Sequence, residues 1–205
     1  MSNIYDAGPQ SGGRSPAPGR LALVQAFENS FYDLGERRGM DHFATRDGLA
    51  EWLEQRGLDA GDVSDADLRR AIAVRDGLRA ILAEHNGAPR DAPAVAALRD
   101  SADGLPVAIG IDDEGRTWPV VLGRGVTGAL GLIMAAVHEA RANGTWRRLK
   151  ACPGRHCGWA FYDRSVSQTS TWCSMRVCGG REKARAYRRR GRADGDNGVH
   201  SAGRL

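Results

Sequence analysis

The pattern of apolar and polar residues starts some way into the chain. The first twenty residues, MSNIYDAGPQSGGRSPAPGR, are rich in glycine, proline and serine and lack the apolar core of a secretory signal. We therefore expect residues 1–18 to form a disordered tail. An apolar segment follows at residues 21–34, and its spacing does not distinguish a strand from a helix.

Two helices with clear ends are predicted next. Thr45 is a suitable N-cap for a helix over residues 46–56, which Gly57 ends. Ser64 precedes an acidic first turn, and apolar positions then recur at helical spacing until residues 85–87. Because the connection is short, we expect these two helices to pack as a helical hairpin.

A shorter helix, a β-hairpin and a longer helix complete the first part of the chain. The shorter helix covers about residues 92–102, and the hairpin pairs residues 106–111 with residues 116–122. The longer helix runs from about Val126 to Ala142, and Asn143-Gly144 ends it.

These elements favour an α+β fold with two parts. A helix-rich domain with a small β-hairpin covers residues 19–144, and a C-terminal module covers residues 145–192. Residues 193–205 are expected to form a second disordered tail. The longest apolar stretch, residues 129–137, is far shorter than the roughly 20 residues of a membrane span. We therefore expect a cytoplasmic protein with no membrane partner.

The net charge of +4 hides a separation of charge along the chain. Residues 145–192 contain 13 arginine or lysine residues and two acids, whereas residues 1–144 contain 15 basic residues and 21 acids. Only two of the basic residues are lysines, a bias typical of a GC-rich bacterial genome. The C-terminal module therefore carries the charge that an anionic partner would recognise.

All four cysteines lie in the C-terminal module, at Cys152, Cys157, Cys173 and Cys178. They form two C-x(4)-C pairs separated by 15 residues, a pattern that predicts one tetrahedral zinc ion. Two disulfides, unligated core cysteines or iron are alternative interpretations, and a reducing cytoplasm disfavours disulfides. Since protein fills all four positions, the zinc is expected to be structural rather than catalytic.

Other residues near the cysteines have less specific interpretations. His156 lies next to a ligand, and we interpret it as an exposed turn residue rather than a substitute ligand. Trp159, Phe161, Tyr162 and Trp172 lie between the two pairs. We expect them to form a small core of the module, with a base-stacking surface as the alternative.

Residues 174–191 are predicted to form an arginine-rich helix that starts at the second cysteine pair. Its basic residues form a stripe that neighbouring arginines broaden, and Glu182 is its one acid. Arginine binds phosphate and guanine through two hydrogen bonds, and a helix fits the major groove, so double-stranded DNA is favoured. RNA, a protein surface such as RNA polymerase, and a solvated tail remain alternatives. The predicted DNA contacts are Arg181, Lys183, Arg185, Arg188, Arg189 and Arg192.

Several motifs of the C-terminal module resemble the CGNR zinc finger family. They are Leu149-Lys-Ala-Cys, Cys157-Gly-Trp-Ala-Phe-Tyr-Asp-Arg-Ser, Trp172-Cys-Ser-Met and Cys178-Gly-Gly-Arg. In that family the finger follows an ABATE domain, which residues 19–144 resemble through the segments that start at Arg20 and Leu68. The resemblance implies a stress-response transcription regulator whose finger binds DNA. The separation of charge along the chain favours an N-terminal domain that senses a small molecule, dimerises or contacts a protein effector.

One position departs from the family signature. Gly180 stands where the CGNR motif has asparagine, so a side-chain amide is lost there. If that amide capped the helix, glycine would weaken the helix start; if it contacted nucleic acid, glycine would alter recognition.

Motifs typical of enzymes are incomplete. Gly123-Arg-Gly125-Val-Thr-Gly128 matches a dinucleotide-binding pattern, but no second parallel strand with a terminal acid follows it. We interpret it as a glycine-rich turn. His138-Glu139 lacks the second histidine of a metalloprotease helix, and no nucleophile can be paired with a base. We expect no enzymatic activity.

Three functional hypotheses follow. The first is a DNA-binding regulator, either monomeric or a homodimer, with a sensor or interaction domain at its N-terminus. The second is a small-molecule sensor or protein-interaction module in which the zinc is purely structural. The third is a redox switch in which oxidation of the thiolates releases zinc.

Overall fold

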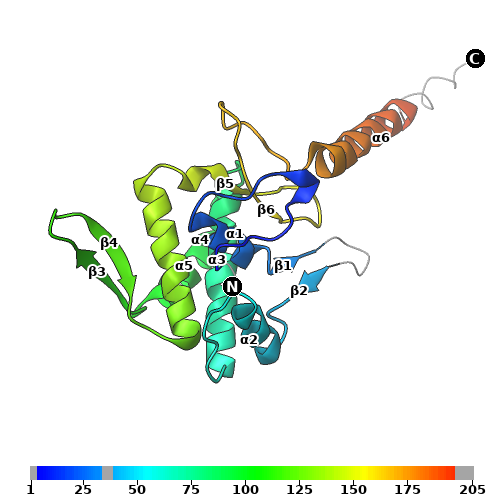
Figure 1. The fold of residues 1–205 in the computed structure, drawn as a ribbon. Coiled ribbons are helices and arrows are strands. Elements are labelled where there is room, and N and C mark those ends of the chain that lie inside the picture. Colours follow the sequence, from blue (N-terminus) through cyan, green and yellow to red (C-terminus); the bar gives the residue numbers. More distant parts are fainter. Residues whose placement is uncertain (1–3, 34–38, 197–205) are drawn as a thin grey trace, which may run out of the picture.

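The computed structural model describes residues 4–33 and 39–196, with side chains up to Arg190 (Figure 1). Its strands form three separate antiparallel pairs, and helices make up the rest of the body. The predicted α+β class is confirmed. In chain order the elements are η1 (Ser11–Gly13), α1 (Leu21–Glu28), β1 (Phe31–Tyr32), β2 (Met40–Asp41), α2 (Arg46–Glu54), α3 (Asp65–Glu84), α4 (Ala92–Ala102), β3 (Val107–Ile111), β4 (Thr117–Val121), α5 (Gly125–Ala142), η2 (Trp146–Arg148), β5 (Leu149–Ala151), β6 (Ala160–Tyr162), the π-helical turn η3 (Met175–Gly179) and α6 (Gly180–Asp196).

Helix α1 lies at the centre of the body, and all eight of its residues are buried. Helices α3 and α5 and strand β6 surround it (Figure 1). A helix that is enclosed on all sides needs no polar face and so lacks an amphipathic period. This explains why the spacing in residues 21–34 did not distinguish a helix from a strand.

The predicted N-caps of α2 and α3 are confirmed. The Thr45 hydroxyl accepts a hydrogen bond from the backbone N–H of Gly48 at 3.1 Å. Ser64 and Asp67 form a capping box, in which each side chain accepts from the backbone N–H of the other residue. These bonds satisfy amide groups that a helix start otherwise leaves unpaired.

Helix α3 packs most extensively against α4, rather than forming its main pair with α2 as expected. The close approach occurs at Gly77, where a Cβ atom would lie 2.4 Å from Cβ of Leu98 and 2.8 Å from the Ala94 carbonyl oxygen. A side chain larger than hydrogen at Gly77 would therefore force the two helices apart.

A buried polar cluster ties α1, α3 and β2 together. Arg75 is 3% exposed and donates to the Asp41 carboxylate at 2.6 Å. Glu28 is fully buried on α1, with the Arg79 Nε 3.4 Å from its carboxylate. The ring of Phe43 lies 4.9 Å from the Arg75 guanidinium. Arg75 and Glu28 are buried, whereas the side chains of Asp41 and Arg79 keep some contact with water. Removal of Asp41 would leave the buried Arg75 guanidinium without its partner, which is costly.

Residues 4–18, hereafter the N-terminal segment, lie against the body, so the predicted disordered tail is wrong for them. The Ala17 N–H donates to Oε1 of Gln25 at 2.7 Å, and Nε2 of Gln25 donates to Oε1 of Gln10 at 2.7 Å. Ala7 and Ala17 are buried. The composition gave no sign of this because the contacts use irregular backbone and buried amides on α1 rather than a periodic apolar face.

The C-terminal helix is longer than predicted. Helix α6 continues past Gly191 to Asp196, because a glycine within a helix costs about 1 kcal/mol but does not by itself end it. Of the predicted tail at residues 193–205, residues 193–196 are helical and residues 197–205 lie outside the described part. Among the described residues, no helix combines the length and apolar character needed to span a membrane.

The buried Glu28 carboxyl makes stability depend on pH. Burial raises its pKa from 4.5 to about 8, against the opposing effect of Arg79. Between these values the folded protein keeps a proton that the unfolded chain has lost, so this contribution to stability is full below about pH 4.5 and disappears as the pH rises through about 8. We expect Glu28→Gln to flatten the decline in unfolding free energy over this range, by up to about 1.4 kcal/mol per pH unit.

Urea denaturation at several pH values measures this effect. Glu54→Gln, a change at an exposed carboxylate on α2, is the matched control and should keep the wild-type profile. Parallel profiles for wild type and Glu28→Gln would show that Glu28 does not titrate in this range.

Candidate metal centre

The β5–β6 hairpin lies between two apolar clusters. Leu149, Ala151, Ala160 and Tyr162 belong to the main core, which they share with the helices of the N-terminal domain. Phe161 points to the other side, where it packs with the four cysteines. This alternation is the two-residue period of a strand. The C-terminal module is therefore packed onto the N-terminal domain along this hairpin.

Polar side chains of the N-terminal domain fix the hairpin further. Asn29, just after α1, binds both backbone groups of Ala160: its Oδ1 accepts from the N–H at 2.8 Å and its Nδ2 donates to the carbonyl at 3.0 Å. Asn86, after α3, donates to the carbonyls of Ala151 and Thr171, both at 2.8 Å. The two asparagine side chains thus bond to backbone groups of the hairpin that have no neighbouring strand to pair with.

The four predicted ligands come together. The Sγ atoms of Cys152, Cys157, Cys173 and Cys178 all lie within 4.8 Å of one another, and all four residues are buried. The Sγ of Cys173 lies 3.7 Å from that of Cys157 and 3.6 Å from that of Cys178. Zinc–sulfur bonds of about 2.3 Å in a tetrahedron place sulfur atoms about 3.8 Å apart. The cysteines are therefore positioned to bind one structural zinc ion.

The same distances contradict the disulfide interpretation. A disulfide requires sulfur atoms about 2.05 Å apart, and all four cysteines are free. Hydrogen bonds from the thiols of Cys152 and Cys157 lower the pKa of Cys173, whereas burial raises the pKa of Cys178. Without a cation, the cluster therefore favours a thiolate at Cys173 and protonated thiols at its neighbours. A divalent ion that displaces the remaining protons resolves this competition.

Each cysteine pair is closed by local backbone hydrogen bonds. In the first pair, the Cys157 N–H donates to the Gly154 carbonyl at 2.9 Å. A Cβ atom at Gly154 would lie 3.3 Å from Sγ of Cys178, so the turn packs directly on the second pair. His156 turns away from the sulfur atoms and lies 3.1 Å from the Asp33 carboxylate. The expectation that it is a turn residue and not a ligand is confirmed.

The second pair coincides with the start of the arginine-rich helix. The Ser174 hydroxyl accepts from the Val177 N–H at 3.3 Å, and the Ser174 carbonyl accepts from the N–H groups of Cys178 and Gly179. The turn between them, η3, is π-helical and leads without a break into α6. A metal ligand therefore lies in the turn that immediately precedes α6.

The N-terminal segment supplies contacts to the metal site that were not predicted. Arg14 donates to the carbonyl oxygens of Cys173 at 2.8 Å and Trp172 at 3.0 Å, and the Ser11 hydroxyl lies 3.4 Å from Sγ of Cys173. Gly12 packs on Ser174, with room for no larger side chain. These partners are some 160 residues apart in sequence, so no local pattern could have indicated them.

A buried ion pair orders the loop between the two cysteine pairs. Lys150 donates to the Asp163 carboxylate at 2.9 Å and to the carbonyls of Gln168 and Ser170. Burial opposes the charged form of Asp163, but hydrogen bonds from Lys150, Ser165 and Ser170 hold its pKa below the usual range. Both residues stand within the motifs singled out in the sequence, yet the sequence gave no role to either. Their role is to fix the loop that leads to Cys173.

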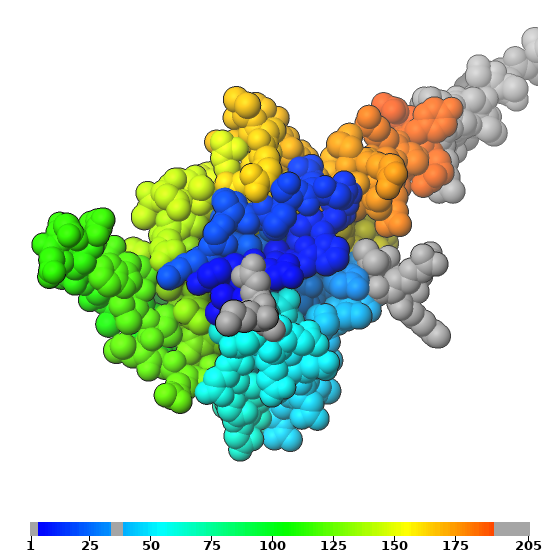
Figure 2. All heavy atoms as spheres, viewed as in Figure 1, coloured from blue at the N-terminus to red at the C-terminus, as the bar shows by residue number. Residues whose placement is uncertain are grey.

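The predicted DNA contacts lie on a helix that projects from the body (Figures 1 and 2). Arg181, Lys183, Arg188 and Arg189 are exposed. Arg185 is partly buried and forms an ion pair with Glu182, so part of its charge is neutralised. The side chain of Arg192 lies outside the described residues. Tyr187, which was not predicted, is 74% exposed among the arginines.

Three of the four aromatic residues between the cysteine pairs form the small core of the module, as expected, whereas Tyr162 belongs to the main core. Phe161 is 1% exposed, and Trp159 and Trp172 pack against it and the cysteines. Trp159 also contacts the Tyr32 ring, with ring centroids 5.4 Å apart. These contacts leave the described aromatic rings of this cluster little face on which a base could stack.

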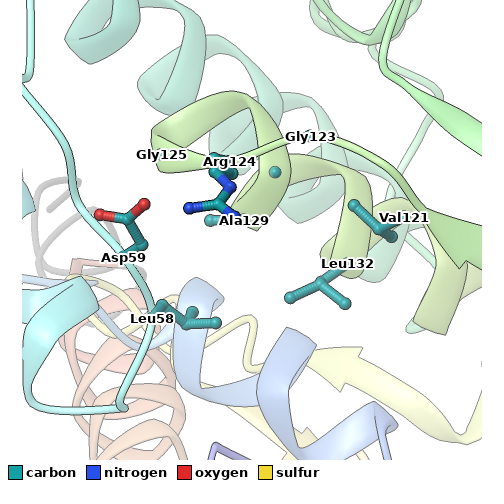
Figure 3. A pocket seen from close by; sticks show the side chains of 9 residues that line it. Leu58, Asp59, Val121, Gly123, Arg124, Gly125, Ala129 and Leu132 are labelled. Atoms are coloured by element: carbon teal, nitrogen blue, oxygen red, sulfur yellow. The ribbon is translucent and has the colours of Figure 1, made fainter.

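The glycine-rich sequence at Gly123–Gly128 lines a surface pocket at the start of α5 (Figure 3). Its glycines are explained by backbone packing: a Cβ at Gly128 would lie 2.4 Å from the Gly123 carbonyl oxygen. The side chains of Arg124 and Asp59 face each other at one side of the pocket (Figure 3). A carboxylate there disfavours a phosphate group, which agrees with the interpretation as a glycine-rich turn.

Four clustered thiols, two from a β-hairpin and two from the start of a helix, define this part of the molecule as a zinc finger. Comparison with protein-family models confirms this, because residues 148–191 match the CGNR zinc finger. Residues 19–144 match the ABATE family, whose description is "Putative stress-induced transcription regulator". The chain belongs to this family. A search of curated proteins gives no match.

Loss of the Arg14 contacts should weaken zinc binding. We expect Arg14→Ala to lower zinc affinity by about 10- to 100-fold, as is typical when a group that orients a metal ligand is removed. Competition with a chromophoric chelator measures the affinity. Arg46→Ala, which removes an exposed arginine from α2, is the control and should leave the affinity unchanged. Equal affinities for both variants would mean that the N-terminal segment does not support the site.

Loss of Lys150 should destabilise the whole protein. Lys150→Met leaves the Asp163 carboxylate buried without its cation, which typically costs about 3–5 kcal/mol. Chemical denaturation of the zinc-loaded protein measures this cost. The double variant Lys150→Met with Asp163→Leu removes both charges and should recover much of the loss. A single variant as stable as wild type would contradict a structural role for the pair.

Proposed function

We propose that the protein is a bacterial, cytoplasmic transcription regulator that binds double-stranded DNA through α6. The observation that carries this proposal is the exposure of a strongly basic helix that projects from the body (Figure 2). Between Met175 and Arg190 the chain has seven basic residues and one acid. Like charges at this density repel one another unless an anion lies between them.

The arrangement of charge around α6 suits the major groove. At 100° per residue, Arg181, Arg185 and Arg188 share one side of the helix, whereas Lys183 and Arg190 lie on the opposite side. A helix in the major groove has base edges below it and a phosphate backbone on each flank. Basic residues on two sides can therefore contact both backbones, and the side between them is directed at the bases.

The metal centre gives this helix its position. Cys178 lies in the turn that leads into α6, so zinc and the packed β5–β6 hairpin hold the base of the helix against the body. All four thiols belong to that cluster, and the proposal assigns them a structural role and assigns the chain no enzymatic activity.

The N-terminal domain is proposed to act as a sensor or interaction domain. The pocket beside α5 supports a small-molecule effector, because it combines apolar walls from Leu58, Val121 and Leu132 with the polar groups of Asp59 and Arg124 (Figure 3).

Selection from a library of genomic DNA fragments tests the proposal. The zinc-loaded full chain is incubated with the library at two salt concentrations, and the chelated protein is the control. Enrichment of particular sequences that depends on zinc and weakens with salt is the expected result. Binding to no fragment, with zinc bound and the fold intact, would contradict DNA binding and favour a protein contact for α6.

Substitutions on α6 should change the salt dependence of binding. Each phosphate contact contributes about −0.9 to the slope of log K against log salt, so Arg188→Gln with Arg189→Gln should reduce the slope by about 2. Fluorescence anisotropy with an enriched duplex measures it. The control, Arg69→Gln with Arg99→Gln, removes the same charge from exposed sites on α3 and α4. An identical loss of slope in both double variants would mean that total charge matters and α6 does not.

A further inference from the structure

The β3–β4 hairpin projects from the body on the side opposite α6 (Figures 1 and 2). It carries exposed apolar side chains. The exposed fractions are 61% for Ile109, 68% for Ile111, 42% for Trp118 and 68% for Leu122. A two-stranded hairpin is marginally stable in water, and apolar residues gathered on one are typical of an interaction surface.

The register of the hairpin shows which edge is open. The Leu122 N–H donates to the Pro106 carbonyl at 2.9 Å, and the Asp112 N–H donates to the Arg116 carbonyl at 3.1 Å. Hydrogen-bonded pairs alternate along an antiparallel ladder, so Ile109 and Pro119 face each other as a non-hydrogen-bonded pair. The backbone groups of these two residues therefore point outward, away from the hairpin.

The β3 and β4 edges of the hairpin differ in the backbone groups that can bond to a further strand. On β4 the central outward position is Pro119, which has no N–H to donate, and β4 also lies beside α5. On β3 the outward residues Ile109 and Ile111 have complete backbone groups. The N–H of the third outward residue, Val107, already donates to the Leu105 carbonyl at 2.9 Å. An additional strand can therefore pair along β3 but not along β4.

We infer that β3 pairs antiparallel with β3 of a second copy of this chain, which joins two hairpins into one four-stranded sheet. A two-fold axis at Ile109 places Ile109 opposite its own copy and Val107 opposite Ile111. β3 presents β-branched apolar residues at these three positions, with the small residues Ala108 and Gly110 between them. The strand is thus complementary to itself, as a symmetric dimer requires.

The size of the contact fits a weak, reversible dimer. Of the exposed apolar side chains, Val107, Ile109 and Ile111 lie on β3 itself and each leaves on the order of 100 Å² in water, whereas Trp118 lies on β4 and Leu122 follows it. Both copies together then offer about 600 Å² of apolar side chain along the joined edges, less than a stable interface buries. A dissociation constant in the upper micromolar range is expected.

Sedimentation velocity of the zinc-loaded full chain, without DNA, tests this pairing. Across the micromolar range the wild type should pass from the mass of one chain to that of two. Ile109→Pro removes the outward N–H together with the branched side chain and should keep the mass of one chain throughout. Ile109→Val keeps the N–H and the branched side chain and should dimerise like the wild type.

A second variant keeps the test informative if the proline variant does not fold. Ile109→Lys with Ile111→Lys leaves the backbone unconstrained, places like charges along the edge, and should also prevent the dimer. Circular dichroism and zinc content establish that each variant is folded. A wild type that remains one chain, or a dimer that persists in folded Ile109→Pro, would overturn the inference. Because DNA is absent, neither result bears on DNA binding.

Discussion

The structure of the C-terminal module depends on holding four sulfur atoms within 4.8 Å of one another. Among the described residues, Phe161, Trp159 and Trp172 are the apolar partners that pack around them, and these form too small a core to fold by itself. Four thiolates at this distance repel, and four thiols leave an apolar region with weak hydrogen bonds. A zinc ion makes the arrangement favourable because it converts mutual repulsion into four bonds to one centre.

A structural zinc ion joins the two cysteine pairs of this module but does not position the module alone. The outer face of β5–β6 is part of the main core, and Asn29 binds the backbone of Ala160 from the end of α1. Arg14 binds the chain around Cys173 from the opposite side. The N-terminal segment and the end of α1 thus both contact the chain around the metal centre. A change in packing around α1 would reach the ligands through these contacts, which is the physical route that the proposed effector would need to act on α6.

The sequence predicts an interaction best when the residues that form it are close together along the chain. Caps such as Thr45 and Ser64 act within one turn, and the cysteine pairs close within six residues, so both left readable local patterns. The N-terminal segment could not be predicted, because Arg14 meets its partners only after the whole domain has folded. The fully buried α1 was ambiguous for another reason, since burial on all sides removes the amphipathic period. Lys150 and Asp163 both lie in motifs of the sequence, but no local pattern indicates that they form an ion pair.

The surroundings of Gly180 show which of two roles the asparagine of the family motif could have: capping the helix or contacting nucleic acid. The cap of this helix is Ser174, six residues earlier, and the Gly180 N–H already donates to the Met175 carbonyl. A side-chain amide at residue 180 would therefore not cap the helix. Gly180 has helical φ and ψ of −64° and −43°, and a Cβ there would have only the Met175 carbonyl oxygen nearby, at an ordinary 3.7 Å. Asparagine would fit without strain, at a position on the surface of the helix that is proposed to contact DNA. Its loss in this chain is thus a change of contact surface, and the helix start tolerates it because Ser174 and the metal centre already hold that turn.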